Sequence, residues 1–283
     1  MKPLFFSLLL FLSLPDWAHA QGYQVYALRF ASMGHPSAIS DWSDGAPQKD
    51  SINIDFMIWL IKGNGRNILV DAGFRRDMIG FPDAMEFAIK NYTRPDSVLA
   101  KLGLKAEDIT DIILSHPHWD HVDGIGLFPK ARIWVQKEDY NYFVGGSWQK
   151  GGSNGGYDPR DVRLLVDLNI AGRVTLVDGD DKEIIPEIKV FTGSRHTFNS
   201  QFVLVETGMR KIVLASDNIW VYYSLEHMRP PSAGGTFDTT AYVRSMGRMK
   251  TLASSPRYII PGHDARVFTL FPKVADGVVR IDE

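Results

Sequence analysis

The segment 115–121, which reads Ser-His-Pro-His-Trp-Asp-His, constrains this chain more than any other feature. Three histidines and an aspartate lie within six residues, directly after the apolar run 112–114. The spacing H-x-H-x-D-H would arise by chance in a chain of this composition with a probability of roughly one in a thousand. Because imidazole nitrogens and carboxylate oxygens bind zinc and other first-row metals, the fold must present this segment as a metal-binding loop after a buried strand.

The spacing within the motif favours two metal ions. His116 and His118 are two residues apart and can converge on one cation, whereas Asp120 and His121 project toward an adjacent point. Two such ions, about 3.5 to 4 Å apart, can share a bridging hydroxide. Each first-row ion takes about four or five ligands, so further ligands must come from distant loops.

Three residues elsewhere in the chain meet that need. His196, Asp217 and His263 each follow a short apolar run that is typical of a buried strand. A carboxylate buried after such a run requires a partner, and a dication is one. The sequence contains no cysteine, which excludes disulfides, thiolate metal sites and iron-sulfur clusters. Histidines and carboxylates must therefore supply the whole site.

The remaining chain alternates between strand-like apolar runs and amphipathic segments, which predicts a layered α/β fold. Its 283 residues, 45% of them hydrophobic, suffice for one domain over 21–283. Strands are predicted at 23–30, 52–61, 67–71, 109–114, 131–135, 173–177, 188–191, 202–206, 211–215 and 258–260. Helices are predicted at 83–91, 96–102, 137–144, 161–168 and 239–254. Turn signals at 63–65 and Gly208 indicate hairpins, so the sheets should be partly antiparallel.

Two segments, 145–159 and 229–236, are rich in glycine or in glycine and proline. Neither has the strand, helix and Lys-Ser/Thr pair that a phosphate-binding loop requires. We expect both to be surface loops that could border a substrate cleft.

The first twenty residues differ from the rest. Lys2 precedes an apolar run at 4–14, and residues 18–20, Ala-His-Ala, put small residues at the −3 and −1 positions of a cleavage site. A membrane-spanning helix needs roughly 20 apolar residues, more than this run contains. We therefore expect 1–20 to be a signal peptide, cleaved near Ala20, and the protein to be exported to the periplasm or secreted without a membrane anchor.

The net charge of the chain limits the kinds of partner that it can bind. Lys and Arg total 31 and Asp and Glu total 33, so the net charge is −2 at pH 7. No broad basic field exists to bind nucleic acid or an anionic membrane, and the expected partner is a small-molecule substrate. The aromatic residues Trp148, Tyr157, Trp220, Tyr222 and Tyr223 could line either a homodimer contact or a hydrophobic acyl pocket.

The order of the candidate ligands resembles the metallo-β-lactamase superfamily. That pattern is an Asp after an early strand, H-x-H-x-D-H, a later His, a later Asp and a final Gly-His. Asp71 matches the early Asp, which supports the metal loop, and the match extends over about 67–264. The resemblance implies a four-layer αβ/βα sandwich with two divalent metal ions, zinc by default. It assigns His116, His118 and His196 to the first ion, Asp120, His121 and His263 to the second, and Asp217 to both.

Residue 217 separates the branches of that family. Two-metal β-lactamases have Cys or Ser there, whereas Asp resembles the lactonase, thioester hydrolase and phosphotriesterase branches. The run 214–217 and the exported single-domain layout look most like the N-acyl-homoserine lactonase-like group. A thioester hydrolase of the glyoxalase type would carry a basic C-terminal motif, and 267–283 contains only Lys273 and Arg280 as basic residues.

Two positions depart from the lactonase pattern. Lactonases often have Thr-Pro-Gly-His after the third His, whereas 196–200 here reads His-Thr-Phe-Asn-Ser. They also commonly place a Tyr three residues after the bridging Asp, where it polarises the lactone carbonyl, and this chain has Trp220 there. We expect Tyr222 or Tyr223 to supply the missing hydroxyl, unless the preferred substrate differs.

The chemistry implied is hydrolysis of a lactone or other carboxylic ester by a metal-bridging hydroxide. Asp120 is expected to pass a proton to the leaving group while it also binds metal. The alternatives are a thioester or phosphotriester hydrolase of the same superfamily, a β-lactamase, and an exported module that binds metal without turnover.

Overall fold

The computed structural model describes residues 22–75, 85 and 87–283, so the expected signal peptide at 1–20 lies outside the described residues. The described strands form two main sheets and one short pair. The larger sheet has the order β14-β15-β1-β4-β5-β6-β7-β8, and the smaller has the order β13-β12-β11-β10-β9. The pair consists of β2 (Ser37–Ala38) and β3 (Ser51–Ile52).

The larger sheet combines antiparallel and parallel strands. Its members are β1 (Gln24–Ser32), β4 (Asp55–Gly63), β5 (Arg66–Val70), β6 (Asp111–Ile113), β7 (Arg132–Gln136), β8 (Val174–Val177), β14 (Lys273–Ala275) and β15 (Val278–Arg280). The predicted turn at 63–65 joins β4 and β5 as antiparallel neighbours, and β5 to β8 run parallel. The first seven residues of β4 are buried on both faces, which is why this strand reads as a continuous apolar run.

The smaller sheet is mostly antiparallel. It contains β9 (Lys182–Ile185), β10 (Ile188–Thr192), β11 (Gln201–Glu206), β12 (Lys211–Ser216) and β13 (Ile259–Pro261). The predicted turn at Gly208, whose φ is +81°, joins β11 and β12. A longer connection brings β13 beside β12 in parallel.

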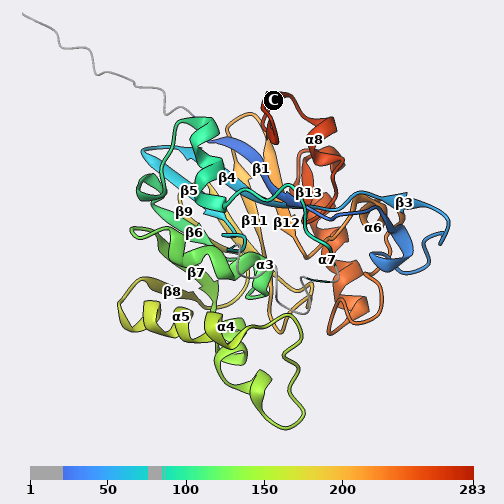
Figure 1. Cartoon of the computed structure of the whole chain (residues 1–283), viewed down its shortest axis with the longest axis horizontal. Helices are drawn as coiled ribbons and strands as arrows, with labels where there is room; N and C mark the ends of the chain where they lie inside the picture. Colours follow the sequence, from blue (N-terminus) through green and yellow to red (C-terminus); the bar gives the residue numbers. More distant parts are fainter. Residues whose placement is uncertain (1–21, 76–84, 86) are drawn as a thin grey trace, which may run out of the picture.

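Helices cover the outer faces of the two sheets (Figure 1). On the larger sheet, α4 (Lys137–Val144) and α5 (Pro159–Ile170) pack near β7 and β8, and α7 (Thr239–Leu252) packs near β12 of the smaller sheet. The other α-helices are α2 (Pro95–Val98), α3 (Trp119–Val122), α6 (Tyr222–His227) and α8 (Val267–Leu270). The 3-10 helices are η1 (Ile39–Asp41), η3 (Leu99–Leu102), η4 (Ala106–Asp108), η5 (Asp123–Leu127), η6 (Gly146–Trp148) and η7 (Pro256–Tyr258).

Local sequence explains where the two longest helices begin. The Asp158 carboxylate accepts a hydrogen bond from the backbone N–H of Arg160 and caps α5, which has Pro159 in its first turn. The Asp238 carboxylate caps α7 in the same way through the N–H of Ala241. Among the described helices, none combines the length and the apolar character that crossing a membrane would require.

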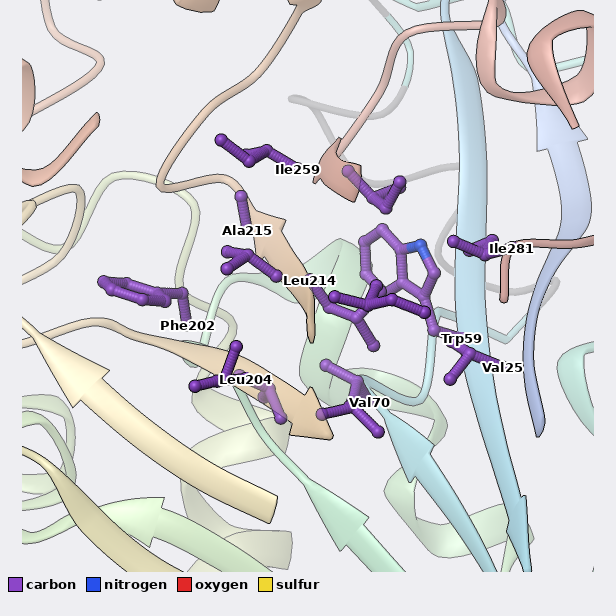
Figure 2. Packing of buried hydrophobic residues seen from close by; sticks show 14 of the residues in the cluster. Val25, Trp59, Val70, Phe202, Leu204, Leu214, Ala215, Ile259 and Ile281 are labelled. Atoms are coloured by element: carbon purple, nitrogen blue, oxygen red, sulfur yellow. The ribbon is translucent and has the colours of Figure 1, made fainter. Parts of the chain in front are cut away.

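The main core lies between the two sheets (Figure 2). Val25, Trp59 and Val70 project from the larger sheet and are fully buried. They meet Leu214 and Ile259 from the smaller sheet. With helices on both outer faces, the architecture is the expected four-layer αβ/βα sandwich.

Most predicted elements are present, with shifted ends. All ten predicted strands are found, and the predicted helix 96–102 is split into α2 and η3. The predicted helix 83–91 lies partly outside the described residues; of its described residues, Met85 is helical and 87–91 are not. The physical reason is that the backbone of Lys90 pairs with that of Ser32 through two hydrogen bonds of 2.8 and 2.9 Å.

The strands missed by the prediction are short: β2, β3, β9, β14 and β15. Two of these strands, β14 and β15, had a recognisable signal in the sequence. The dipeptide Asp276-Gly277 between them is typical of a hairpin turn.

Candidate metal centre

The predicted ligands meet at the carboxyl ends of strands from both sheets. Residues 115–121 follow β6, and Asp71 follows β5 of the same sheet. His196, Asp217 and His263 follow β10, β12 and β13 of the smaller sheet. Because the ends of these strands come together where the two sheets meet, residues almost 150 positions apart lie within contact distance.

Three histidines form the first group of potential ligands. Nε2 of His116, Nδ1 of His118 and Nε2 of His196 lie 3.1, 3.1 and 3.2 Å from one another. Ligands about 2.0–2.1 Å from a tetrahedral zinc ion are roughly 3.3 Å apart, so this triangle has the size of one face of a zinc site. Oδ2 of Asp217 lies 3.4 Å from His196 Nε2 and completes the group.

The second group consists of Asp120, His121 and His263. Oδ2 of Asp120 lies 3.2 Å from Nε2 of His121 and 3.5 Å from Nε2 of His263. Oδ1 of Asp217 lies 3.3 Å from His121 Nε2 and 3.0 Å from His263 Nε2. The two oxygens of Asp217 therefore face different groups, as a carboxylate shared between two cations would.

The donor atoms fit two divalent metal ions. Nε2 of His121 and Oδ1 of Asp217 are buried and have no hydrogen-bond partner among the described residues. Buried polar atoms in folded proteins are almost always paired, and each unpaired one costs about 1–3 kcal/mol. Cations held by these two groups would supply the missing partners, and the nitrogen and oxygen donors suit zinc or a similar first-row ion.

Burial and neighbouring charges set the protonation states of the histidines in the two groups. Burial and the imidazole of His196 lower the pKa of His118 to about 3. Burial, together with the imidazoles of His121 and His196, holds the pKa of His116 well below its usual value. These rings are neutral at pH 7, which is the form that binds metal.

In the second group, the neighbouring carboxylates outweigh the effect of burial on the histidine pKa values. Burial would lower the pKa of His121 and His263, but the carboxylates of Asp120 and Asp217 raise both values. Burial would also raise the pKa of Asp217, but the imidazoles of His263 and His121 hold it well below the usual value. The Asp217 carboxylate is therefore ionised and able to bind a cation.

Asp71 supports the centre from behind. Its carboxylate lies 2.9 Å from Nδ1 of His121 and accepts hydrogen bonds from the backbone and hydroxyl of Ser115 and from the hydroxyl of Ser216. These contacts fix His121 with Nε2 toward the site and tie the metal loop to β12. This is the supporting role that the sequence predicted for Asp71.

Other ring nitrogens are held in the same manner. Nδ1 of His116 lies 2.9 Å from the hydroxyl of Ser115, and Nδ1 of His196 lies 2.8 Å from the carbonyl oxygen of Gly235. Nδ1 of His263 lies 3.2 Å from the carbonyl oxygen of Asp55. Each of these contacts leaves the second ring nitrogen free to face the centre.

Two glycines give the ligands room, a role that was not predicted for either of them. A Cβ atom on Gly156, whose φ is +74°, would lie 2.8 Å from the ring of His118. A Cβ on Gly262 would lie 2.4 Å from Oδ1 of Asp217. Gly262 belongs to the Gly-His pair of the family pattern, and Gly156 lies in the glycine-rich segment 145–159, but neither signal shows which atom the glycine must approach.

A cavity of about 640 Å³ opens onto both ligand groups. His118, Asp120, His196, Asp217 and His263 form part of its wall. Both glycine-rich segments contribute to it, through Ser153, Gly155, Gly156, Ala233, Gly234 and Gly235. Its aromatic lining consists of Trp42, Phe56, Phe87, Trp119, Trp220 and Phe237. The expectation that the two loops could border a cleft is confirmed.

The structure does not place Tyr222 or Tyr223, one of which was expected to supply a hydroxyl to the substrate, in the wall of the cavity. Neither is among the described residues that line the cavity, whereas Trp220 is. Tyr222 is buried under the guanidinium of Arg266, 5.0 Å from its ring centre. The ring of Tyr223 lies 4.1 Å from that of His227, next to a separate groove. Helix α6 begins at Tyr222, and the rings of Tyr222 and Tyr223 lie away from the cavity.

A family model supports the assignment that the fold and site suggest. The model of the metallo-beta-lactamase superfamily matches residues 57–263. The chain belongs to this superfamily, and its fold and ligand set are those of a metal-dependent hydrolase.

Individual relatives of the chain within this superfamily are N-acyl homoserine lactonases. The chain is 25% identical over 223 residues to an N-acyl homoserine lactonase from Bacillus cereus, covering 75% of this chain and 82% of that relative. It is 24% identical over 258 residues to N-acyl homoserine lactonase AiiB from Agrobacterium fabrum, covering 82% and 89% of the two chains.

Solved structures share the fold. An AiiA variant from B. thuringiensis with N-decanoyl-L-homoserine bound at its active site matches with a TM-score of 0.70 at 21% identity, over 88% of this chain and 96% of that one. AidC, described as a dizinc quorum-quenching lactonase, matches with a TM-score of 0.62 at 18% identity, over 86% and 88% of the two chains.

Proposed function

We propose that this protein is a dinuclear metal-dependent hydrolase that opens lactones of the N-acyl-homoserine type. The observation that carries the proposal is the position of Asp217, whose two oxygens face two separate ligand groups at one cavity. Two bound divalent ions would lower the pKa of a water molecule toward neutrality and polarise an ester carbonyl. The donor set suits zinc, and the similar lactonase AidC is described as a dizinc enzyme.

The cavity wall suits a neutral substrate with an apolar substituent. Six aromatic side chains line it, and none of its described lining residues is a lysine or arginine. A substrate with an anionic tail would therefore find no lysine or arginine among the described lining residues. An acyl chain would instead bury apolar surface against the aromatic rings, at about 25 cal/mol per Å². The lactonase relatives and the acyl-homoserine bound to the similar AiiA structure support this substrate class.

The chain's own side chains have distinct tasks in this reaction. Asp120 lines the cavity, and its carboxylate would take up the proton that the attacking water gives up and pass it to the leaving alkoxide oxygen of the opened ring. Trp119, Phe56 and Phe87 form an apolar wall that limits access of bulk water. Asp71 and Ser115 hold the metal loop in place during turnover.

We also propose that 1–20 is a signal peptide and that 21–283 forms one exported domain. The apolar run at 4–14 and the small residues before the cleavage site support the first proposal. The larger sheet supports the second, because it pairs β1 near the start of the described chain with β15 near its end.

The test is hydrolysis by the purified protein of N-hexanoyl-homoserine lactone, a simple alkyl lactone, a thioester, a phosphotriester and a β-lactam. We expect turnover of the lactones, with loss on chelation and recovery when zinc or another divalent ion is added. Metal-loaded protein that hydrolyses a thioester or phosphotriester but no lactone would reject the proposed substrate while leaving the metal centre intact.

A further inference from the structure

The indole of Trp220 is hydrogen-bonded to the carboxylate that the two ligand groups share. Its Nε1–H donates to Oδ2 of Asp217 at 2.8 Å. An indole has one polar hydrogen and no acceptor, so this bond uses the whole hydrogen-bonding capacity of the side chain. Trp220 therefore has no donor left with which to polarise a substrate carbonyl, although it lines the cavity.

We propose that Trp220 is a positioning residue that fixes the orientation of Asp217 between the two metal ions. With Oδ2 held by the indole, that oxygen faces the histidines of the first group, 3.4 Å from Nε2 of His196. Oδ1 is then turned toward His121 and His263 of the second group. Without the indole N–H, the carboxylate could turn about the last side-chain bond of Asp217 into orientations in which its two oxygens no longer point at the two ligand groups.

The indole is itself fixed by contacts with other parts of the site. Its ring meets the ring of His196 edge-on, with centroids 5.7 Å apart, and the ring of Trp42 edge-on at 5.5 Å. Its backbone carbonyl accepts a hydrogen bond of 3.0 Å from the N–H of His263. Trp220 thus contacts three of the seven candidate ligands, namely Asp217, His196 and His263.

A buried tyrosine closes the arrangement on the backbone side. The hydroxyl of Tyr242 accepts a hydrogen bond of 3.1 Å from the N–H of Trp220 and donates one of 3.2 Å to the carbonyl oxygen of Asp217. The backbones of Asp217 and Trp220 are therefore tied to each other through the Tyr242 hydroxyl. These bonds fix the backbone that carries the two side chains, and the ring contacts with His196 and Trp42 hold the indole itself.

The loop 229–236 is shaped to accept the indole. A Cβ atom on Gly235 would lie only 2.4 Å from the Trp220 ring, so a larger residue would displace one or the other. The carbonyl oxygen of the same glycine lies 2.8 Å from Nδ1 of His196. The close approach of Gly235 to Trp220 therefore also brings a ligand of the first group into position.

This inference rests on the dinuclear centre of the proposed function, but it does not depend on the substrate. The primary variant is Trp220→Phe, which removes the N–H and keeps an aromatic ring. The second variant places β-(3-benzothienyl)alanine at position 220, so that sulfur replaces the N–H with little change of shape. The matched control is Trp134→Phe, because Nε1 of Trp134 donates at 3.0 Å to Oδ1 of Asp111, a carboxylate outside both ligand groups.

The readouts are the metal content and dissociation constants from competition with a chelator, and the visible spectrum of the cobalt-loaded proteins. We expect both position-220 variants to bind metal roughly 10- to 100-fold more weakly than the wild type and to show a changed cobalt spectrum. The Trp134→Phe protein should match the wild type in both measurements.

Wild-type affinity and an unchanged cobalt spectrum in the benzothienyl protein would overturn the inference. Weaker binding in the Trp134→Phe control as well would also overturn it, because the loss would then reflect general destabilisation. If the wild type binds two metals but hydrolyses no lactone, the proposed substrate fails, and a loss of affinity at position 220 still supports the role of Trp220.

Discussion

Nδ1 of His121 lies 2.9 Å from Oδ2 of Asp71, an aspartate whose backbone has a φ of +62°. Asparagine tolerates this left-handed conformation and has almost the same volume, so Asp71→Asn changes mainly the charge and one acceptor. We expect the affinity for the second metal to fall roughly 10- to 100-fold, because His121 loses the partner that orients it. Chelator competition measures this, and unchanged affinity would show that Asp71 does not support the centre.

Gly156 and its neighbour form a matched pair for testing the space around His118. Gly156→Ala would put a methyl group 2.8 Å from the His118 ring at a backbone φ of +74°, whereas a Cβ on Gly155 would meet no atom within 4 Å. We expect Gly156→Ala to reduce bound metal and hydrolysis at least tenfold, and Gly155→Ala to retain both. Equal behaviour of the two variants in metal analysis would contradict the structure of this loop.

Asp120→Asn tests the proton-transfer role in the proposed reaction. The variant keeps the side-chain volume but removes the charge that faces His121 and His263 at 3.2 and 3.5 Å. We expect kcat to fall by about 10²- to 10⁴-fold, the usual effect of losing a general acid-base group, with the fold preserved. Asp167→Asn, at an exposed position of α5, is the control. Wild-type kcat in Asp120→Asn would remove this carboxylate from the mechanism.

The buried carboxylate of Asp139 should make the free energy of unfolding depend on pH. This carboxylate of α4 accepts hydrogen bonds from the Thr197 hydroxyl at 2.6 Å and the Asn199 N–H at 3.0 Å, next to His196 in the chain. Burial raises its pKa to about 6, although these hydrogen bonds oppose the shift. Between pH 4 and 6 the unfolded chain has lost this proton while the folded chain keeps it, so the free energy of unfolding falls as the pH rises.

The matching experiment compares Asp139→Asn with the wild type by urea unfolding at several pH values, with chelator present throughout. A shift of about two pH units corresponds to about 3 kcal/mol over the whole titration, of which the wild type should lose about 2 kcal/mol relative to the variant between pH 4 and 6. Glu138→Gln, which removes an exposed carboxylate from the same helix, controls for the loss of one charge. A difference between wild type and Asp139→Asn that stays constant with pH would contradict the raised pKa.

The candidate ligands could be predicted from the sequence because each one has a local signal. His116, His118, Asp120 and His121 share one short motif, and Asp217 and His263 each end an apolar strand. The structure brings all seven candidates into two adjacent groups. Residues that follow neighbouring strands lie close together at one edge of a sheet. The order of the ligands along the chain therefore indicated that they belong to one site.

The surroundings of the ligands could not be predicted in the same way. The bond between Trp220 and Asp217 and the approach of Gly235 to the indole depend on tertiary packing between distant loops. Tyr222 was expected in the cavity because it lies two residues beyond Trp220. The backbone N–H of Tyr222 instead donates at 2.9 Å to the buried carboxylate of Asp264, and its ring turns under Arg266.

The central claim is that two metal ions share Asp217 and that both are needed for lactone hydrolysis. The most direct measurement is a zinc titration of metal-free protein, with bound metal and hydrolysis of N-hexanoyl-homoserine lactone followed together. We expect activity to rise until two zinc ions are bound per chain and then to level off. Full turnover by metal-free protein, or an activity that levels off at one ion per chain, would contradict it.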